Sequence, residues 1–292
     1  MLPRLRSSEW ALIVFYSYVA VVSLFFPLTT GLKYPAFLAA VCVAVVILVF
    51  AIGEQIQRSK FWSFARDWLP LPLTLLSYRE MNWFTKPHVG HPLEHAWIVW
   101  DRWLLNEHGL RTFLESAGWI GPGFLESCYL LVYAVGPFVV AILYVYHRRD
   151  LVDRVVLTYL AGTLLAYGLF PYFPSDPPRV VFVGMDLPHT MTVLRRLNLA
   201  IVGGVGIHSS VFPSAHVSSA FSGAWGLLIF LRERRRAGWG MLIYAVSVSV
   251  ATVYGRYHYA VDALAGFAIS LPALLLAVMI ARRDPKMRGM LN

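Results

Sequence analysis

The sequence predicts an all-α, polytopic membrane protein, and three observations lead to this fold class. Hydrophobic residues make up 58% of the 292 residues and charged residues only 14%, whereas soluble domains carry about 25% charged residues. The mean hydropathy is +0.60. Long apolar runs recur along the whole chain. A soluble globule of this length could not bury so many apolar side chains beneath a polar surface, so a cytosolic or secreted globular domain, a disordered chain and a coiled coil are excluded.

Hydropathy predicts seven membrane helices directly, each approaching the ~20 residues that the bilayer core requires. They cover residues 9–28, 35–53, 119–146, 151–173, 211–232, 238–256 and 258–282. The first run is long for a signal-peptide core and a second span follows it at once, so we expect a retained membrane helix.

The basic residues indicate an eighth crossing. Of the 25 lysines and arginines, 16 lie in segments that the positive-inside rule assigns to the cytoplasm. They are Arg4, Arg6, Arg58, Lys60, Arg66, Arg148, Arg149, Arg154, Arg232, Arg234, Arg235, Arg236, Arg282, Arg283, Lys286 and Arg288. Both ends of the chain satisfy the rule only if the chain crosses once between 66 and 119, and the short stretch 68–78, with two prolines, is the best candidate. The alternative is an interfacial helix there, with seven spans and an external N-terminus. Because this rule accounts for the net charge of +9, we expect no nucleic-acid partner.

This topology divides the chain into three parts. Residues 1–60 hold two N-terminal spans, residues 61–282 form the membrane core, and residues 283–292 form a basic cytoplasmic tail. The core has two external segments. In 82–118, tryptophans 97, 100 and 103 recur at three-residue spacing and predict a helix in the headgroup region; 174–210 is rich in Pro and Gly and shows no long periodic run.

Three polar clusters are predicted to meet at the external membrane boundary. They are residues 172–179, the Pro-Ser-Ala-His segment ending at His216, and residues 256–262. His258 and Asp262 are four residues apart and share a helix face, so the carboxylate can fix the imidazole tautomer. His216 begins a helix, where free N–H groups favour anions, and Arg179 and Arg256 are charged forks that suit phosphate oxygens. Together these residues indicate a phosphoryl-transfer site that needs no metal.

Each of these features also has an ordinary structural explanation. His–Asp pairs often only satisfy each other in a membrane core, Pro-Ser is common before a helix, and arginines anchor helices at the interface. Glu126 is expected to be a structural hydrogen-bonding group. We expect His88, His91 and His95 to lie at the surface without binding a metal, and His189 and His208 to be loop residues. Cys42 and Cys128 lie inside apolar runs, so we expect neither a disulfide nor a zinc site.

The ordered set of motifs resembles the type 2 phosphatidic acid phosphatase superfamily. The resemblance rests on Pro-Ser-Ala-His216, on His258-x-x-x-Asp262 placed 42 residues later, and on Pro-Pro-Arg179 upstream, and it runs from about residue 62 to about 275. It implies a six-helix core with the first two spans as an addition. The branch that the chain looks most like contains inositol phosphorylceramide synthases and their bacterial relatives.

The resemblance also implies roles for individual residues. His258 would be the nucleophile that forms a phosphohistidine, Asp262 would orient it, and His216 would be the general acid, with no metal or other cofactor. Arg179, Ser214 and Arg256 would hold the phosphoryl oxygens, and Ala215 stands where the signature has glycine. Tyr172 replaces the usual lysine, and Ala251 and Thr252 replace a Ser-Arg pair. These departures favour the inositolphosphotransferase-like branch and leave Arg256 as the nearest substitute for the missing arginine.

Three functions follow from these observations. The first is a phosphatase or phosphoalcohol transferase that acts on a lipid phosphate at the extracytoplasmic face of a bacterial plasma membrane, with water or an alcohol such as inositol as acceptor. The second is an intramembrane serine protease that uses Ser214 or Ser210 with His258. The third is a transporter or scaffold without catalysis. The sequence does not determine the lipid, the acceptor or the oligomeric state.

Overall fold

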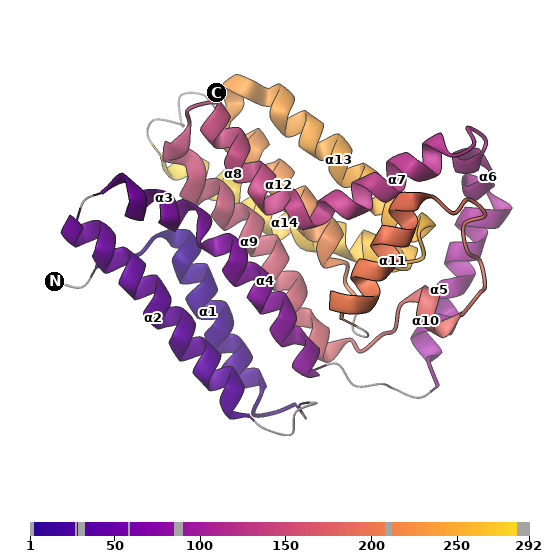
Figure 1. The fold of residues 1–292 in the computed structure, drawn as a ribbon, viewed down its shortest axis with the longest axis horizontal. Coiled ribbons are helices and arrows are strands. Elements are labelled where there is room, and N and C mark those ends of the chain that lie inside the picture. Colours follow the sequence, from indigo (N-terminus) through magenta and orange to yellow (C-terminus); the bar gives the residue numbers. More distant parts are fainter. Residues whose placement is uncertain are drawn as a thin grey trace.

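The structure is a computed structural model, and it describes residues 3–26, 28, 33–57, 59–84, 90–207 and 212–284. Throughout these ranges the regular structure is helical and there is no strand, so the predicted all-α class is confirmed (Figure 1). The helices are α1 (Ser7–Val22), α2 (Tyr34–Gln57), α3 (Lys60–Trp68), α4 (Pro70–Met81), α5 (Pro92–Arg102), α6 (Leu110–Glu115), α7 (Ile120–Leu131), α8 (Val135–Val145), α9 (Val152–Leu169), α10 (Pro178–Val181), α11 (Val193–Val205), α12 (Ala215–Phe230), α13 (Arg235–Tyr254) and α14 (Ala260–Arg283). Short turns of other helix types are η1 (Asn82–Phe84), η2 (Trp103–Glu107), η3 (Val132–Ala134), η4 (Arg149–Leu151), η5 (Phe170–Tyr172) and η6 (Arg232–Arg234).

Five helical segments are long and apolar enough to cross a membrane, among the residues that the structure describes. They are Tyr34–Gln57, Ile120–Val145, Arg149–Tyr172, Arg232–Tyr254 and Ala260–Arg283, and α1 and α12 are shorter apolar helices. All seven coincide with spans that hydropathy predicts. The segment Ile120–Val145 contains one irregularity, the 3₁₀ turn η3 between α7 and α8. The polytopic character of the chain is therefore clear, while the total of eight crossings stays a prediction.

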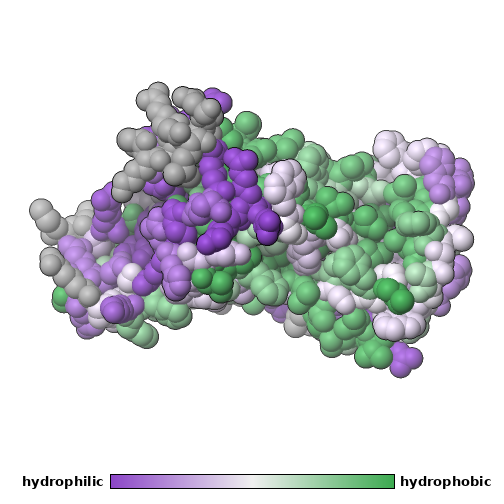
Figure 2. Space-filling view, turned by 90° about the horizontal axis from the view of Figure 1, so that it is seen from above, coloured by the Kyte–Doolittle hydropathy of each residue, from purple (hydrophilic) through white to green (hydrophobic). Residues whose placement is uncertain are grey.

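The basic segments meet at one end of the bundle through ion pairs. Arg6 contacts Asp67 at 2.6 Å, and Arg149 contacts the same carboxylate at 2.5 Å. Arg66 contacts Glu9 at 2.5 Å. Further pairs join the other loops and the last helix, namely Arg6–Glu54, Arg66–Glu54, Arg148–Glu233 and Arg154–Asp284. We call the end of the bundle that holds these ion pairs the polar end. Figure 2 shows hydrophilic residues gathered toward one end of the visible face, with hydrophobic side chains over most of the remainder. Arg58, Lys286 and Arg288 lie outside the described residues.

Helices α3 and α4 carry the chain from the polar end to the opposite end. Arg66 and Asp67 in α3 belong to the polar end, whereas Tyr78 in α4 accepts a hydrogen bond from the N–H of Ile207 at the other end. Leu69 alone separates the two helices, which continue one another along the bundle (Figure 1). The chain therefore changes ends here, as the eight-span interpretation requires and the interfacial-helix alternative does not.

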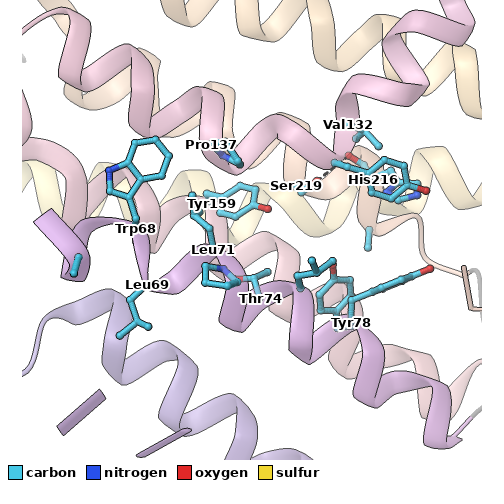
Figure 3. Close-up of a pocket in the computed structure, with 16 residues that line it drawn as sticks. Trp68, Leu69, Leu71, Thr74, Tyr78, Val132, Pro137, Tyr159, His216 and Ser219 are labelled. Atoms are coloured by element: carbon cyan, nitrogen blue, oxygen red, sulfur yellow. Dashed lines mark hydrogen bonds between the residues drawn. The ribbon is translucent and has the colours of Figure 1, made fainter. Parts of the chain in front are cut away.

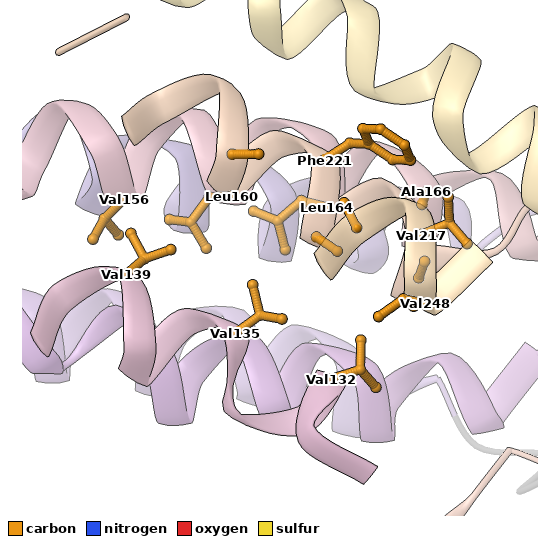
Figure 4. Packing of buried hydrophobic residues seen from close by; sticks show 14 of the residues in the cluster. Val132, Val135, Val139, Val156, Leu160, Leu164, Ala166, Val217, Phe221 and Val248 are labelled. Carbon is orange, nitrogen blue, oxygen red and sulfur yellow. The ribbon is translucent and has the colours of Figure 1, made fainter. Parts of the chain in front are cut away.

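Helix α12 occupies the centre of the bundle and packs against α8, α9, α13 and α14. Figure 4 shows Val217 of α12 in one buried cluster with valines and leucines of α8 and α9. The ring of Phe221, also in α12, packs against Phe267 of α14, with the ring centroids 4.8 Å apart. Small residues bring α12 and α9 together, because a Cβ at Gly162 would overlap Ser222, and Ser218 donates to the carbonyl of Gly162 at 2.9 Å. Such small-residue contacts are typical of membrane helices, and they fix the height at which α12 begins.

The expectation that 174–210 holds no long periodic run is wrong. Helix α11 has 13 residues, and the side chain of Thr192 caps it by accepting from the N–H of Arg195. Its buried face includes Arg195, Asn198 and Val202. Two of these three residues are polar, so a search for apolar periodicity does not find the helix.

Candidate active site

The turn between α13 and α14 holds His258 beside Asp262. The N–H groups of Tyr257 and His258 both donate to the carbonyl of Thr252, at 2.9 and 3.0 Å, and Arg256 adopts a φ of 62°. This tight turn leaves His258 just before the first turn of α14. Its Nδ1 lies 3.3 Å from Oδ2 of Asp262, which also accepts from the N–H of Tyr259 at 2.9 Å. The predicted pairing of His258 with Asp262 is therefore present, and it leaves Nε2 as the nitrogen directed away from the carboxylate.

The start of α12 is joined directly to the start of α14. The N–H of Ser214 donates to the carbonyl of Asp262 at 3.0 Å. Gly266 permits this approach, since a Cβ there would lie 2.4 Å from the Ser214 carbonyl oxygen. The Ser214 side chain is the N-cap of α12 and accepts from the N–H of Val217. His216 is the second residue of α12, so these contacts fix its position relative to His258.

The two histidines meet. The ring centroids of His216 and His258 are 5.7 Å apart, with the ring planes perpendicular at 90°. Tyr129 and Tyr133 each place a ring 5.4 Å from that of His216, and Tyr129 stacks on Tyr257 at 3.7 Å. The histidines are 42 residues apart in the chain, and they converge because α12 and α14 start side by side.

Arg179 lies at the same place, on the short helix α10. Its Nη1 donates to the carbonyl of Tyr257 at 3.2 Å, and its guanidinium carbon is 5.9 Å from the centre of the Tyr257 ring. Among the described residues, no carboxylate forms an ion pair with Arg179. Its positive charge is therefore available to an anion.

A small cavity of about 40 Å³ is bounded by these groups. Its lining includes Arg179, Ala215, His216, Tyr257 and His258. A volume of this size holds about three water-sized groups, which is the scale of the oxygens of one phosphoryl group.

A second, larger cavity of about 550 Å³ continues from the first. Tyr78, Tyr133, Ala215 and His216 line both cavities. From His216 the larger cavity runs along α4 to Trp68, past apolar side chains of α4 and α7–α8 (Figure 3). The small cavity thus forms a polar pocket at one end of a long apolar cavity.

Arg256 is directed elsewhere. It is 1% exposed, and its Nη1 contacts Oδ2 of Asp101 at 2.5 Å. It is not among the residues that line the cavity with the two histidines. Asp101 also accepts from the N–H of Ala260, at 2.8 Å. Burial raises the pKa of the Asp101 carboxyl to about 6, and the neighbouring Arg256 opposes that rise. The structure therefore brings Arg179, a predicted phosphate contact, together with the predicted catalytic residues His216 and His258. It separates Arg256, another predicted phosphate contact, from them.

Helix α5 supplies two buried carboxylates that sequence reasoning missed. Glu94 and Asp101 are both 0% exposed, and the side chain of Glu94 accepts from the N–H of Asp176 at 2.8 Å. Their seven-residue spacing, with buried Ile98 between them, is the signal that could have located this inward face. Trp100 and Trp103 are exposed, as a headgroup helix predicts, but Trp97 turns inward and stacks on Phe212 at 5.3 Å.

Glu126 is the centre of a buried network, as the sequence predicted in outline. It accepts from Arg195 at 2.8 Å, from Asn198 at 2.7 Å and from the hydroxyl of Tyr257 at 2.7 Å. Burial, reinforced by Glu126, raises the pKa of the Tyr257 hydroxyl above its ordinary value, so this hydroxyl stays protonated and donates. The network fastens α11 and α7 to the turn that carries His258.

The other residues that the sequence analysis singled out and the structure describes do not line the small cavity. Ser214 is fully buried and does not line the small cavity, which disfavours a serine nucleophile. Tyr172 is exposed and contacts the ring of Phe26. His189 pairs with Glu115 at 2.8 Å. Within the described ranges, no three His, Cys, Asp or Glu residues are grouped as a metal site. His88, His208 and Ser210 lie outside those ranges.

A comparison with known families places these motifs in context. A family model described as the PAP2 superfamily matches residues 95–276. The match covers more than half of the 292-residue chain and includes Arg179, both histidines and Asp262. No curated protein and no solved structure matches the chain.

Proposed function

The chain belongs to the PAP2 superfamily, and from this membership we propose that it is a membrane-embedded lipid phosphatase acting through a phosphohistidine. One observation carries the proposal. Two perpendicular imidazoles, 5.7 Å apart, and an arginine that no carboxylate of the described residues pairs with line a phosphoryl-sized cavity that opens into a long apolar one. A polar pocket continuous with an apolar cavity fits a phosphate ester of a hydrocarbon chain better than it fits a soluble phosphate.

The first half-reaction uses both histidines. Nε2 of His258 attacks phosphorus, and the N–P bond forms as the bond from phosphorus to the lipid oxygen breaks. His216 gives its proton to that departing oxygen. Asp262 accepts the Nδ1–H of His258 and stabilises the positive ring that forms, and Arg179 offsets charge on the phosphoryl oxygens.

The second half-reaction returns the enzyme to its starting state. Water attacks the phosphohistidine and passes a proton to the now neutral His216. The N–P bond breaks, and phosphate leaves. An alcohol in place of water would give a phosphoester instead. The alanine at 215 and the replacements at 172, 251 and 252 support an inositolphosphotransferase-like enzyme, with an alcohol such as inositol as the acceptor.

The orientation of the site follows from the charges. The histidines lie at the end of the bundle opposite the polar end, and the polar end carries the arginines that the positive-inside rule assigns to the cytoplasm. This distribution supports an active site at the extracytoplasmic face of the membrane, which we expect to be a bacterial plasma membrane. An impermeant thiol reagent on intact cells should label Val183→Cys, at an exposed position near Arg179, in a Cys42→Ser background.

The mechanism is tested with lipid phosphate labelled in its phosphate group. Wild-type protein should form an acid-labile phosphoprotein, and vanadate should inhibit turnover. His258→Ala should lose both the phosphoprotein and turnover, whereas His189→Ala, a control on an exposed histidine, should keep both. Full turnover in His258→Ala would refute the assigned role.

A second assay separates the hydrolase from the transferase. Labelled phospholipid is incubated with purified protein, with and without an acceptor alcohol such as inositol. Release of inorganic phosphate in both conditions supports the phosphatase. Transfer of label to the alcohol, dependent on His258, supports the transferase.

A further inference from the structure

We propose that the hydrocarbon chain of the substrate enters sideways, between α4 and the α7–α8 segment, and lies along α4 in the larger cavity as far as Trp68. The inference rests on the proposed function and makes it more specific, because it names the part of the lipid that the protein selects.

The cavity has an opening toward the lipid side. Four of its lining residues are exposed: Pro72 and Leu75 (60%) of α4, Tyr133 of η3 at 41%, and Pro137 of α8. Others are buried, such as Thr74 at 3% and Val132 at 5%. The exposed residues stand on the two facing elements and the buried ones lie beneath, so the gap between α4 and η3–α8 forms a lateral portal. The turn η3 interrupts the α7–α8 helix at this place.

Ala65 and Trp68 line the opposite end of the cavity, and aromatic rings and charges border it there. The ring of Trp68 lies 6.0 Å from those of both Phe64 and Tyr144. Immediately beyond it, Asp67 is paired with Arg6 and Arg149. A hydrocarbon chain gains nothing from moving among ion pairs, and those charges resist desolvation. The hydrocarbon chain of the substrate should therefore end at Trp68.

The length of the cavity sets the number of carbons of the substrate's alkyl chain that it can hold. Tyr78, beside the histidines, and Trp68 are ten positions apart along α3–α4, and a rise of 1.5 Å per residue makes that about 15 Å. An extended alkyl chain advances ~1.25 Å per carbon–carbon bond, so about twelve carbons next to the phosphate occupy the cavity. Turnover should rise with chain length up to about twelve carbons and then level off.

The test uses alkyl phosphates of four to sixteen carbons with paired tryptophan variants. Leu75→Trp and Pro137→Trp narrow the portal from its two sides. Leu76→Trp and Phe138→Trp are their controls, because Leu76 and Phe138 are exposed neighbours that do not line this cavity. All proteins are assayed in one detergent, so partition of each substrate cancels in the ratio of variant to wild type.

The portal variants should lose kcat/KM for dodecyl phosphate and keep it for butyl phosphate. Each methylene contact removed costs about fourfold, so displacing two methylenes gives a loss of about 15-fold. The control variants should stay within about twofold of wild type for both substrates. Retained butyl phosphate turnover also shows that a portal variant is folded.

The inference and the proposed function fail in different ways. Wild-type protein that hydrolyses no alkyl phosphate at all overturns the function. Wild-type protein that hydrolyses them, with portal variants that treat butyl and dodecyl phosphate alike, overturns the inference alone. A Trp68→Ala variant gives an independent measurement: the levelling-off should move to longer chains, and an unchanged profile overturns the assignment of Trp68 as the end of the cavity.

Discussion

Gly266 controls how closely the two histidine-bearing segments approach each other. A Cβ at this position would lie 2.4 Å from the Ser214 carbonyl oxygen and 3.1 Å from Cβ of Val217. The oxygen is backbone at the N-terminus of α12, so it moves only if the helix start moves. Relief to an ordinary contact of about 3.4 Å requires a displacement of roughly 1 Å. Gly266→Ala should therefore move His216 away from His258.

The magnitude follows from the geometry. A 1 Å misplacement of a catalytic group costs about 10²-fold in rate, so Gly266→Ala should lower kcat about a hundredfold. Overpacking costs about 1–3 kcal/mol of stability, and alanine in a helix returns up to about 1 kcal/mol. The protein should therefore stay folded while losing turnover.

Two glycines give matched controls for this substitution. A Cβ at Gly240 meets nothing within 4 Å, so Gly240→Ala should keep both kcat and Tm. A Cβ at Gly226 would lie 2.9 Å from Val155, within the helix packing, so Gly226→Ala should lower Tm with kcat retained. The assay combines steady-state turnover with thermal unfolding. If Gly266→Ala lowers Tm like Gly226→Ala and keeps wild-type kcat, the contact does not set the histidine geometry.

Three further predictions concern individual side chains. His216→Ala should lower turnover by about 10²–10⁴, the usual contribution of a general acid, and should be partly bypassed by a substrate with a good leaving group such as p-nitrophenyl phosphate; equal losses on both substrates would contradict the role. Asp262→Asn keeps an oxygen for the N–H of Tyr259 and should lower kcat with little change in Tm; a large drop in Tm would indicate a purely structural carboxylate. Asp101→Ala leaves Arg256 buried without its ion-pair partner and should destabilise the protein by about 3–5 kcal/mol, with much of the stability recovered in the Asp101→Ala, Arg256→Met double variant; additive losses in a thermal unfolding assay would show that the pair is not coupled.

Charge and hydropathy predicted the architecture because both are long-range constraints on the whole chain. The basic residues at Arg6, Arg66, Arg149 and Arg154 all reach the polar end, so the passage of the chain from one end of the bundle to the other along α3–α4 was deducible although its own hydropathy is weak. The meeting of His216 with His258 was deducible for the same reason. Once the direction of each helix is known, the ends that point the same way lie at the same end of the bundle, so residues at those helix ends can meet.

Polar helix faces were not predicted, because their signal resembles that of a loop. Helix α11 presents Arg195 and Asn198 to Glu126, and its inward face therefore lacks the apolar period that marks a helix. Glu94 and Asp101 of α5 were hidden by the tryptophans that alternate with them. In each case the partner lies more than 65 positions away in the chain, and a single sequence does not reveal such pairings.

The two arginines that the sequence offered as equivalent are distinguished by their partners. Arg256 is 1% exposed and is compensated by Asp101, because a buried charge in a low-dielectric interior requires an opposite charge close by. Arg179 is partly exposed and is held by a carbonyl oxygen and a ring face, which orient the guanidinium without neutralising it. Among the residues that the structure describes, Arg179 is therefore the one whose uncompensated charge an anion meets on entering the small cavity. Because Asp101 also binds the N–H of Ala260 at the start of α14, Arg256 contributes by fastening α5 to the turn that carries His258, so its loss should reduce activity through the position of that histidine.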